Sequence, residues 1–461
     1  MKKLLIGALA MLGLLPAGAK DLGDQKAASP APEWLENAVI YEANLRQGTP
    51  TRDLKGMQMQ LPRLRDLGVD VVWLMPIHPI SEKERKGKLG SYYAVKDYKA
   101  VNPEFGTMQD LKEFVNTAHT LGMKVILDEV TNHTGADNAW VTEHPEYYAR
   151  NEKGEMFGPY DWTDVYKLDY SHPATRAAMV DALKFWIREA DIDGYRMDVA
   201  GEVPTDFWEE VRPQLQEIKP VLMLAEASKP DLLLKGFDID YAWPMKDVFN
   251  AIALTKGVNE YAVKKGEKRP KMDARDIPAL LKKQKKEYPA GSRHMNMITN
   301  HDLNSWEGTE FERFGPATGA FAVLSYTLPG APMLYTGQET GFNHAFEFFE
   351  ADTIQPSLEN NEVTVFYETL NALKHKNKAL NASAPVTFYE SESPDLLTME
   401  RTADNGDRVV VIANLSGNPL RPDYGKKASP DLSGLQNYFT ATAATLPKEL
   451  APWQYVVLVN N

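Results

Sequence analysis

The stretch MQDLKEFVNTAHTLGMKVILDEV, residues 108–130, decides the fold class of this chain. Its first part has apolar residues at helical spacing and ends at Gly122, and the short apolar run KVILDEV (124–130) follows at once. This order predicts a helix that ends at a glycine, followed by a strand that is buried on both faces. Buried strands that alternate with helices are typical of parallel sheets.

The same unit recurs along most of the chain. Eight apolar runs of strand length alternate with segments of helical period, among them 54–68 and 174–190. Eight such units predict an α/β fold in which the strands close into a (β/α)8 TIM barrel. An open doubly wound sheet is the structural alternative, but no glycine-rich phosphate loop follows the first run. The eight runs are AVIYEANL (38–45), VDVVWLMPI (69–77), KVILDEV (124–130), GYRMDVA (194–200), VLMLAEA (221–227), FDIDYAW (237–243), HMNMITN (294–300) and PMLYTGQE (332–339).

Two departures from this alternation indicate further domains beside a barrel that is expected over residues 33–376. The connection 134–170 is long, polar and aromatic, and is predicted to form a small excursion beside the mouth of the barrel. From residue 377 to residue 461 the chain changes to strand-like runs separated by turns, which predicts a C-terminal β-sandwich. These runs are PVTFYE (385–390), LLTMERT (396–402), RVVVIANLS (408–416) and WQYVVLVN (453–460).

The first residues, MKKLLIGALAMLGLLPAGA (1–19), carry two lysines, an apolar run and a triplet of small residues. This order is typical of a signal peptide, which is expected to be cleaved after Ala19 and to precede a linker over residues 20–32. An uncleaved anchor is the alternative, but the apolar run is shorter than the ~20 residues that a spanning helix needs. No later segment is apolar enough to cross a membrane. We therefore expect export to the periplasm or the medium.

Charge and cysteine content exclude several classes of protein. The formal net charge of -13 argues against a nucleic-acid partner, because phosphate binding requires a clustered positive surface. The basic stretches 264–271 and 282–286 are predicted to be solvated faces. The chain has 0 cysteines and so has neither disulfides nor a lipid-modified cysteine. The sequence leaves the oligomeric state open.

Polar residues end four of the predicted strands, where a barrel of this kind carries its chemistry. Arg196 and Asp198 are two apart on one strand and so point to the same side. An arginine there lowers the pKa of the aspartate, which suits a nucleophile, although a structural ion pair gives the same pattern. Glu226 follows the apolar run VLMLA, whose surroundings favour a neutral, proton-donating carboxyl group, although a glutamate that only caps or pairs is the alternative. The four strand ends are DEVTNH (128–133), GYRMD (194–198), LAE (224–226) and NHD (300–302).

In this order, the four strand ends resemble the conserved regions of the α-amylase family, glycoside hydrolase family 13. The resemblance extends from Val39 to the mid-340s, and the long loop and the C-terminal tail are similar to domains B and C of that family. It implies a retaining hydrolase of α-glucans without an organic cofactor. Asp198 would be the nucleophile, Glu226 the general acid/base and Asp302 the group that stabilises the transition state. With its leader, the chain resembles the secreted bacterial α-amylases.

The resemblance also implies residues that bind the sugar. His133 and His301 would donate hydrogen bonds to hydroxyls of the glucose being cleaved, and Arg196 would lie beside them. Tyr93 would stack on the sugar ring, although its neighbour Tyr92 is easily confused with it. Each of these side chains could equally have a structural role.

The sequence departs from the family pattern in one informative place. Asn132 matches an asparagine that often ligates calcium, and an oxygen-rich site suits that ion. However, VAGEV (199–203) replaces the Lys-His pair that follows the nucleophile in many members, so the presence of calcium stays open.

The segment YKLDY (166–170) differs from the QPDLN type associated with α-1,6 specificity and favours α-1,4 cleavage. The alternatives are a transglycosylase of the same fold and a non-catalytic glucan-binding homologue, which the presence of all three acids disfavours.

Overall fold

The structure is a computed structural model that describes residue 22 and residues 27–424 and 429–460. The predicted signal peptide, residues 1–19, lies outside the described residues, as do residues 20, 21 and 23–26 of the predicted linker. In the described ranges, we find no helix whose length and apolar character would let it cross a bilayer.

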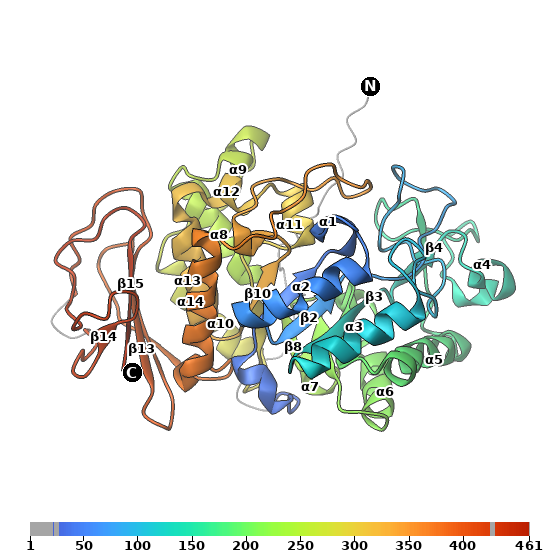
Figure 1. Cartoon of the computed structure of the whole chain (residues 1–461), viewed down its shortest axis with the longest axis horizontal. Helices are drawn as coiled ribbons and strands as arrows, with labels where there is room; N and C mark the ends of the chain where they lie inside the picture. Colours follow the sequence, from blue (N-terminus) through green and yellow to red (C-terminus); the bar gives the residue numbers. More distant parts are fainter. Residues whose placement is uncertain (1–21, 23–26, 425–428, 461) are drawn as a thin grey trace.

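Eight parallel strands close into a barrel in the order β1-β10-β9-β8-β7-β6-β3-β2 (Figure 1). The prediction of a (β/α)8 barrel is confirmed, and each of the eight apolar runs contains or overlaps one strand. The runs form strands because their residues are buried both in the lumen and under the helices. The strands are β1 (Ile40–Ala43), β2 (Val71–Leu74), β3 (Lys124–Glu129), β6 (Gly194–Met197), β7 (Leu222–Ala225), β8 (Ile239–Tyr241), β9 (His294–Asn296) and β10 (Ala331–Tyr335).

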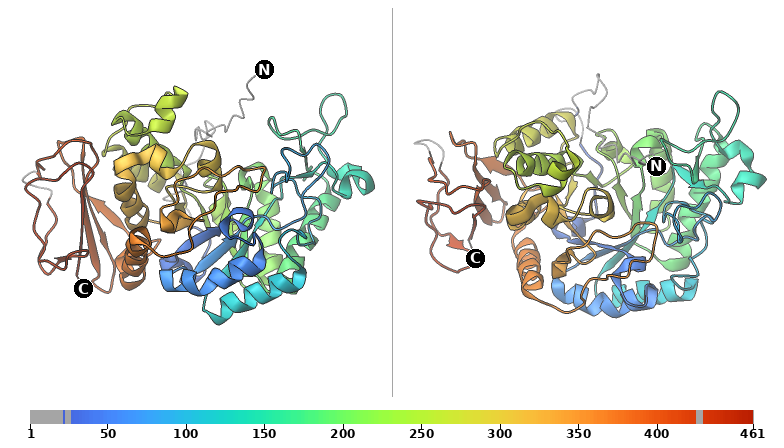
Figure 2. Two further views of the ribbon diagram at one scale, coloured as in Figure 1. Left: turned by 45° about the horizontal axis from the view of Figure 1, so that its top comes forward. Right: turned by 90° about the horizontal axis from the view of Figure 1, so that it is seen from above.

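Helices cover the outside of the barrel (Figure 2). The predicted helix over 54–68 is α2, which ends where Gly68 adopts the left-handed conformation (φ 98°) that glycine tolerates best. The predicted helix over 108–122 is α3, which begins with a capping box at Thr107. The helices are α1 (Leu45–Gly48), α2 (Leu54–Leu67), α3 (Met108–Thr120), α5 (Pro173–Ala190), α6 (Thr205–Gln216), α7 (Leu232–Lys235), α8 (Trp243–Thr255), α9 (Glu260–Lys265), α10 (Asp276–Glu287), α11 (His301–Trp306), α12 (Glu310–Phe314), α13 (Thr318–Thr327) and α14 (Glu362–Lys376).

The long connection after β3 forms a small excursion that Figure 1 shows at the right of the barrel. It contains the antiparallel pair β4 (His133–Gly135) and β5 (Val165–Lys167) and the short helix α4 (Trp140–Glu143). His133 and Lys167 are partners in this pair. The excursion therefore begins at the strand end that carries His133.

The C-terminal residues form an antiparallel β-domain, as the sequence predicts, and its described residues form one five-stranded sheet rather than two facing sheets. One side of the domain contacts the barrel helix α13, where the rings of Phe321 and Trp453 lie 6.2 Å apart. Chain without regular strands, including Leu420 and Leu450, packs on the sheet as a second layer. This part is rich in proline, which cannot donate to a strand ladder. The strands are β11 (Val386–Phe388), β12 (Leu396–Thr402), β13 (Arg408–Asn414), β14 (Gln436–Asn437) and β15 (Tyr455–Val459).

Candidate active site

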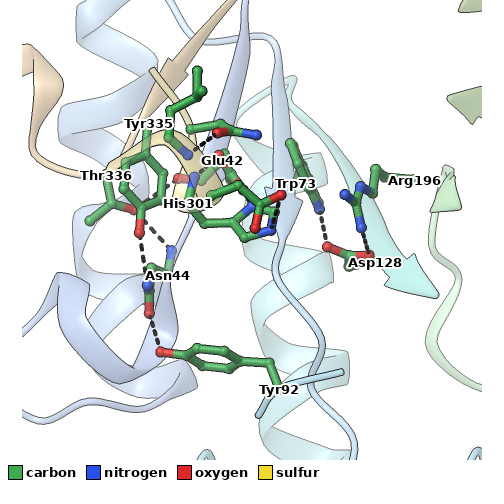
Figure 3. A network of polar contacts seen from close by, with 12 residues as sticks. Glu42, Asn44, Trp73, Tyr92, Asp128, Arg196, His301, Tyr335 and Thr336 are labelled. Carbon is green, nitrogen blue, oxygen red and sulfur yellow. Dashed lines mark hydrogen bonds and ion pairs between the residues drawn. The ribbon is translucent and has the colours of Figure 1, made fainter. Parts of the chain in front are cut away.

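Arg196 is the centre of a polar cluster at the carboxyl ends of β3, β6 and β7. Its Nη1 lies 2.8 Å from Oδ1 of Asp128 and 3.0 Å from Oδ1 of Asp198, and its Nη2 lies 2.9 Å from Oε1 of Glu226. Its Nε donates to the hydroxyl of Tyr241 at 3.1 Å. The guanidinium is fully buried, so one positive charge faces three carboxyl groups at low dielectric. Figure 3 shows the pair that Arg196 makes with Asp128.

The net effect on Asp198 differs from the sequence prediction. Burial and the negative charge of Glu226 raise the pKa of Asp198 well above its usual value, although Arg196 acts to lower it. Arg196 therefore acts on this pKa in the expected direction, but burial and the neighbouring carboxylates outweigh it, and the net shift is upward. Asp198 binds a proton more tightly than an isolated aspartic acid does.

Glu226 is held from two sides. Arg196 contacts one of its oxygens, and the backbone N–H of Val199 donates to the other at 2.9 Å. Val199 lies in the left-handed region (φ 46°), which is an outlier for a β-branched residue. Such strain persists only where the surroundings enforce it, and here it directs the N–H at Glu226.

A second branch of the network leads to His301. The hydroxyl of Tyr93 donates to Oδ2 of Asp128 at 3.0 Å, so its oxygen can only accept from Nε2 of His301 at 2.8 Å. The other ring nitrogen, Nδ1, contacts the carboxylate of Glu42. Burial lowers the pKa of His301, but the charges of Asp302 and Glu42 outweigh it and raise the pKa to about 9. Both nitrogens therefore carry a proton at neutral pH, and Figure 3 shows His301 beside Glu42.

Asp302 is the most open of the three acids predicted to be catalytic. Its side chain is 39% exposed, against 14% for Glu226 and 8% for Asp198. Oδ2 of Asp302 lies 3.4 Å from Nε2 of His301, and its charge contributes to raising the pKa of Asp198. The three acids, distant in the sequence, thus lie around one centre.

The two neighbouring tyrosines have different environments. Tyr93 stacks on His301, with ring centroids 5.3 Å apart and planes at 23°. Tyr92 donates to Asn44 at 3.1 Å, and the guanidinium of Arg46 lies over its ring. Tyr93 is therefore the tyrosine at the carboxylate cluster.

His133 lies on the other side of Asp198. Its Nε2 is 4.0 Å from Oδ2 of Asp198, and its ring lies 5.3 Å from that of Trp162 in the excursion. Burial lowers the pKa of His133 to about 3, so the imidazole is neutral. His133 and His301 therefore differ in charge.

Comparison with known proteins identifies the family. The model of the α-amylase catalytic domain matches residues 39–166 and 147–378. The chain belongs to the α-amylase family of glycoside hydrolases.

Solved α-amylase family structures share the whole architecture. An α-amylase from Lactobacillus plantarum is 28% identical, with a TM-score of 0.78 and coverage of 92% of this chain and 99% of that one. The maltogenic α-amylase AmyB from Thermotoga neapolitana is 26% identical, with a TM-score of 0.77 and the same coverage.

Longer relatives are similar over most of this chain. The α-amylase MalA of Haloarcula japonica is 26% identical over 409 residues, which are 84% of this chain and 57% of MalA. A cyclomaltodextrinase of Geobacillus thermopakistaniensis is 26% identical over 483 residues, which are 93% of this chain and 77% of that enzyme. The chain thus spans little more than half the length of MalA.

Sequence reasoning missed two carboxylates of this α-amylase-family site. Asp128 was part of a quoted motif, but its pairing in register with Arg196 on β3 and β6 could not be read from either segment alone. Glu42 is fully buried in the middle of β1. A charged residue inside an apolar barrel strand was the signal that could have found it, because a buried charge requires a partner.

The surroundings of Asn132 bear on the expected calcium site. The backbone carbonyl of Asn132 accepts from the N–H of Leu168 at 3.0 Å, and its amide nitrogen faces Nδ1 of His133 at 3.4 Å. Nearby Glu202 pairs with the ammonium group of Lys167 at 3.5 Å. In the described part of the chain, no three His, Cys, Asp or Glu side chains are grouped to hold a metal ion. A site for this hard cation would require several free oxygen ligands.

Proposed function

We propose that this protein is a retaining glycoside hydrolase that cleaves α-1,4-glucosidic bonds in starch, glycogen or malto-oligosaccharides. The observation that carries the proposal is that one guanidinium, Arg196, holds the carboxyl groups of Asp198 and Glu226 together. Retaining chemistry needs two carboxyl groups that flank one acetal, a nucleophile and a proton donor, about 5–5.5 Å apart.

In the first step, Asp198 attacks the anomeric carbon of the glucose unit and forms an ester bond to it. Glu226 gives its proton to the departing glycosidic oxygen. The bond between this oxygen and the anomeric carbon breaks, and the leaving sugar departs as a neutral alcohol. The N–H of Val199 and Nη2 of Arg196 hold Glu226 in place. The reaction requires the form in which Asp198 is ionised and Glu226 carries the proton, although burial and the charge of Glu226 raise the pKa of Asp198.

In the second step, water hydrolyses the ester. Glu226, now ionised, takes a proton from water while the water oxygen attacks the anomeric carbon and the carboxylate of Asp198 leaves. Two inversions give the product the configuration of the substrate. We therefore expect an α-configured product.

The charges of the site favour the positive transition state. Five carboxyl groups lie around the two cations Arg196 and His301, and those that are ionised attract the positive charge that develops on the sugar ring. The carboxylate of Asp302, which lies 3.4 Å from Nε2 of His301 and is partly exposed, offers an acceptor to sugar hydroxyls. Hydrogen bonds of this kind strengthen as charge develops on the ring. The carboxyl groups are Glu42, Asp128, Asp198, Glu226 and Asp302.

A product profile tests this function. The purified protein is incubated with soluble starch, pullulan and maltotriose, and the Asp198→Asn variant is the matched control. We expect reducing sugars from starch and maltotriose, little from pullulan, and a loss of at least 10³-fold in the variant, on the order of the effect of removing a nucleophile. Equal turnover by parent and variant would remove the assignment of Asp198, and transfer products without hydrolysis would favour a transglycosylase.

The choice of substrates is guided by the relatives. Proteins named cyclomaltodextrinase, neopullulanase, maltogenic α-amylase and oligo-1,6-glucosidase are all 24–26% identical to this chain. Their names cover both linkage types, so identity alone does not choose between them. The segment YKLDY (166–170) is the feature that supports α-1,4 cleavage.

We also propose that the enzyme acts outside the cytoplasm. The support is the leader-like segment 1–19 with its two lysines, apolar run and small residues. Expression of the full chain in a bacterial host, followed by fractionation and intact mass measurement, tests this proposal. A mature species beginning at Lys20 outside the cytoplasm is expected, and a full-length cytoplasmic protein would contradict the proposal.

A further inference from the structure

A buried pair of a histidine and a glutamate lies behind the site, on the outer side of β3. Glu129 follows Asp128 on this strand, so the two side chains point to opposite faces, that of Asp128 toward Arg196 in the lumen. Nε2 of His78, in the loop after β2, lies 3.2 Å from Oε1 of Glu129, and both side chains are 0% exposed. The imidazole packs on Trp186 of α5, with ring centroids 5.4 Å apart. No part of the chemistry proposed above uses this pair.

The pair has few hydrogen-bond partners for its burial. Neither ring nitrogen of His78 and neither carboxylate oxygen of Glu129 makes a hydrogen bond to any of the described residues. The two atoms that are 3.2 Å apart are therefore at ion-pair distance without the direction of a hydrogen bond. The hydroxyl of Thr131, two residues further along the chain, is unpartnered as well. Buried groups of this kind are normally satisfied by protein or by internal water, and each one that is not satisfied lowers stability.

The tyrosines around Glu129 do not supply the missing donors. Burial raises the pKa values of Tyr98, Tyr170 and Tyr195, and the negative charge of Glu129 adds to each shift, which places the three rings near this carboxylate. Each of the three hydroxyls donates to a backbone carbonyl instead, and a hydroxyl has only one proton to give. The carbonyls are those of Val130, Thr131 and Leu183.

Glu129 is joined to Asp198 through the backbone. Its carbonyl accepts from the N–H of Asp198 at 2.9 Å, and the carbonyl of Met197 accepts from the N–H of Glu226 at 3.0 Å. Directly after Asp198, Val199 has a φ of 46°, and such strain persists only where the surroundings enforce it. The position of Glu129 therefore sets the position of the backbone that carries Asp198.

His78 lies on a segment that is held on both sides. The carbonyl before it, that of Ile77, accepts from the N–H of Asn102 at 2.7 Å. The carbonyl after it, that of Pro79, accepts from the N–H of Lys96 at 2.8 Å. The imidazole is therefore a fixed point, from which the carboxylate that it faces can be restrained.

We propose that His78 and Glu129 are positioning residues that hold the end of β3, and with it Asp198, in the orientation needed for attack, and that internal water completes their hydrogen bonds. The inference rests on the proposed function, because it concerns the residue assigned there as the nucleophile. A buried ion pair can often be replaced by apolar side chains of similar size without loss of stability. Stability alone therefore does not account for this pair.

Two conservative variants of His78 test the positioning role. A glutamine side chain can place its amide nitrogen where Nε2 of the imidazole lies, whereas an asparagine side chain reaches only as far as Nδ1. We expect His78→Gln to retain more than about a third of the parental kcat on maltotriose and His78→Asn to lose roughly tenfold, because small misplacements of reacting groups have effects of this size. KM should change less than about twofold in both variants, because the sugar is assigned to side chains on other segments. Equal kcat in the two variants would overturn the inference.

Replacement of the whole pair separates positioning from stability. In the double variant His78→Phe/Glu129→Leu no polar atom of the pair is left unpartnered, so the melting temperature should stay the same or rise. The value of kcat should nevertheless fall at least about tenfold, because apolar side chains provide no directed contact to hold the strand end. Asp193→Asn is the matched control. It weakens a pair with His119 at the amino end of β6, and should lower the melting temperature without changing kcat.

The inference and the proposed function fail in different ways. Parental kcat in the double variant, with starch hydrolysis by the parent intact, would overturn the inference and leave the proposed function standing. A double variant that does not fold would also overturn the inference, because the pair would then serve stability. Absence of turnover by the parent would overturn the proposed function, and the inference with it.

Discussion

The charge on His301 is the residue-scale feature with the clearest functional consequence. The hydroxyl of Tyr93 and the carboxylate of Glu42 each accept a hydrogen bond from one ring nitrogen of His301, and the pKa of His301 is raised to about 9. The protonated form exists below this pKa. We predict that activity falls as the pH rises through about 9, because loss of this proton removes one of the two contacts that position His301.

Replacing Glu42 tests this pH dependence. In Glu42→Gln the negative charge that raises the pKa of His301 is lost, so the alkaline limb of the kcat/KM profile moves to lower pH. Glu36→Gln, a change in a carboxylate that pairs with Arg293 away from the site, is the matched control. An unshifted limb in Glu42→Gln would show that His301 does not set it.

Arg196 is predicted to be irreplaceable by lysine. An ammonium group cannot contact three carboxyl groups and a hydroxyl from one position, as the planar guanidinium does. Arg196→Lys should lose at least 10²-fold in kcat, and Arg196→Ala should also lose about 3–5 kcal/mol of unfolding free energy, because buried carboxylates lose their partner. Steady-state kinetics and chemical denaturation measure both. Wild-type kcat in Arg196→Lys would contradict this role.

At the scale of elements, the excursion after β3 bears on the metal requirement. Lys167 on β5 pairs with Glu202 after β6, and this contact joins the excursion to the barrel without an ion. We therefore predict that prolonged treatment with a chelator, followed by assay in calcium-free buffer, leaves activity within about twofold of the untreated enzyme. A large loss that only added calcium restores would show that Asn132 has the role suggested by the family resemblance.

The elements also show how far sequence reasoning extends. Runs such as KVILDEV (124–130) are apolar on both faces, so their strand character and parallel arrangement could be predicted before the structure. The register between β3 and β6 sets Asp128 opposite Arg196. It depends on the closure of the barrel and could not be predicted from the sequence. The raised pKa of Asp198 depends on its burial and on Glu226, 28 residues later, so the segment around Asp198 alone could not predict it. The choice of Tyr93 over Tyr92 depends on loop geometry in the same way.

At the scale of the whole molecule, Arg401 joins the barrel to the C-terminal domain. Its side chain is fully buried and donates to the carbonyls of Thr327 and Asn381 at 2.8 Å each, and also to those of Ala384 and Pro385. Burial lowers the pKa of Arg401 to about 9, since no carboxylate contacts it directly. The residue is therefore important for stability and distant from the chemistry.

Substitution of Arg401 separates stability from catalysis. Arg401→Met removes the donor from the buried carbonyl of Thr327 and from three partly buried carbonyls, so thermal unfolding should begin several degrees lower, on the order of 3–5 kcal/mol of destabilisation. The kcat of the folded protein at low temperature should stay near that of the parent. Calorimetry and kinetics on the same sample provide both values. A selective fall in kcat without a change in melting would contradict the assignment.

The central claim is that one barrel mouth places Asp198, Glu226 and Asp302 around a single acetal. Its most direct test is to incubate the Glu226→Gln variant with α-maltosyl fluoride, whose leaving group needs no acid, and to map the adduct by mass spectrometry of proteolytic peptides. The account predicts a maltosyl ester on the peptide that contains Asp198, because the second step lacks its base. An adduct on another residue, or hydrolysis at the parental rate without any adduct, would contradict the account.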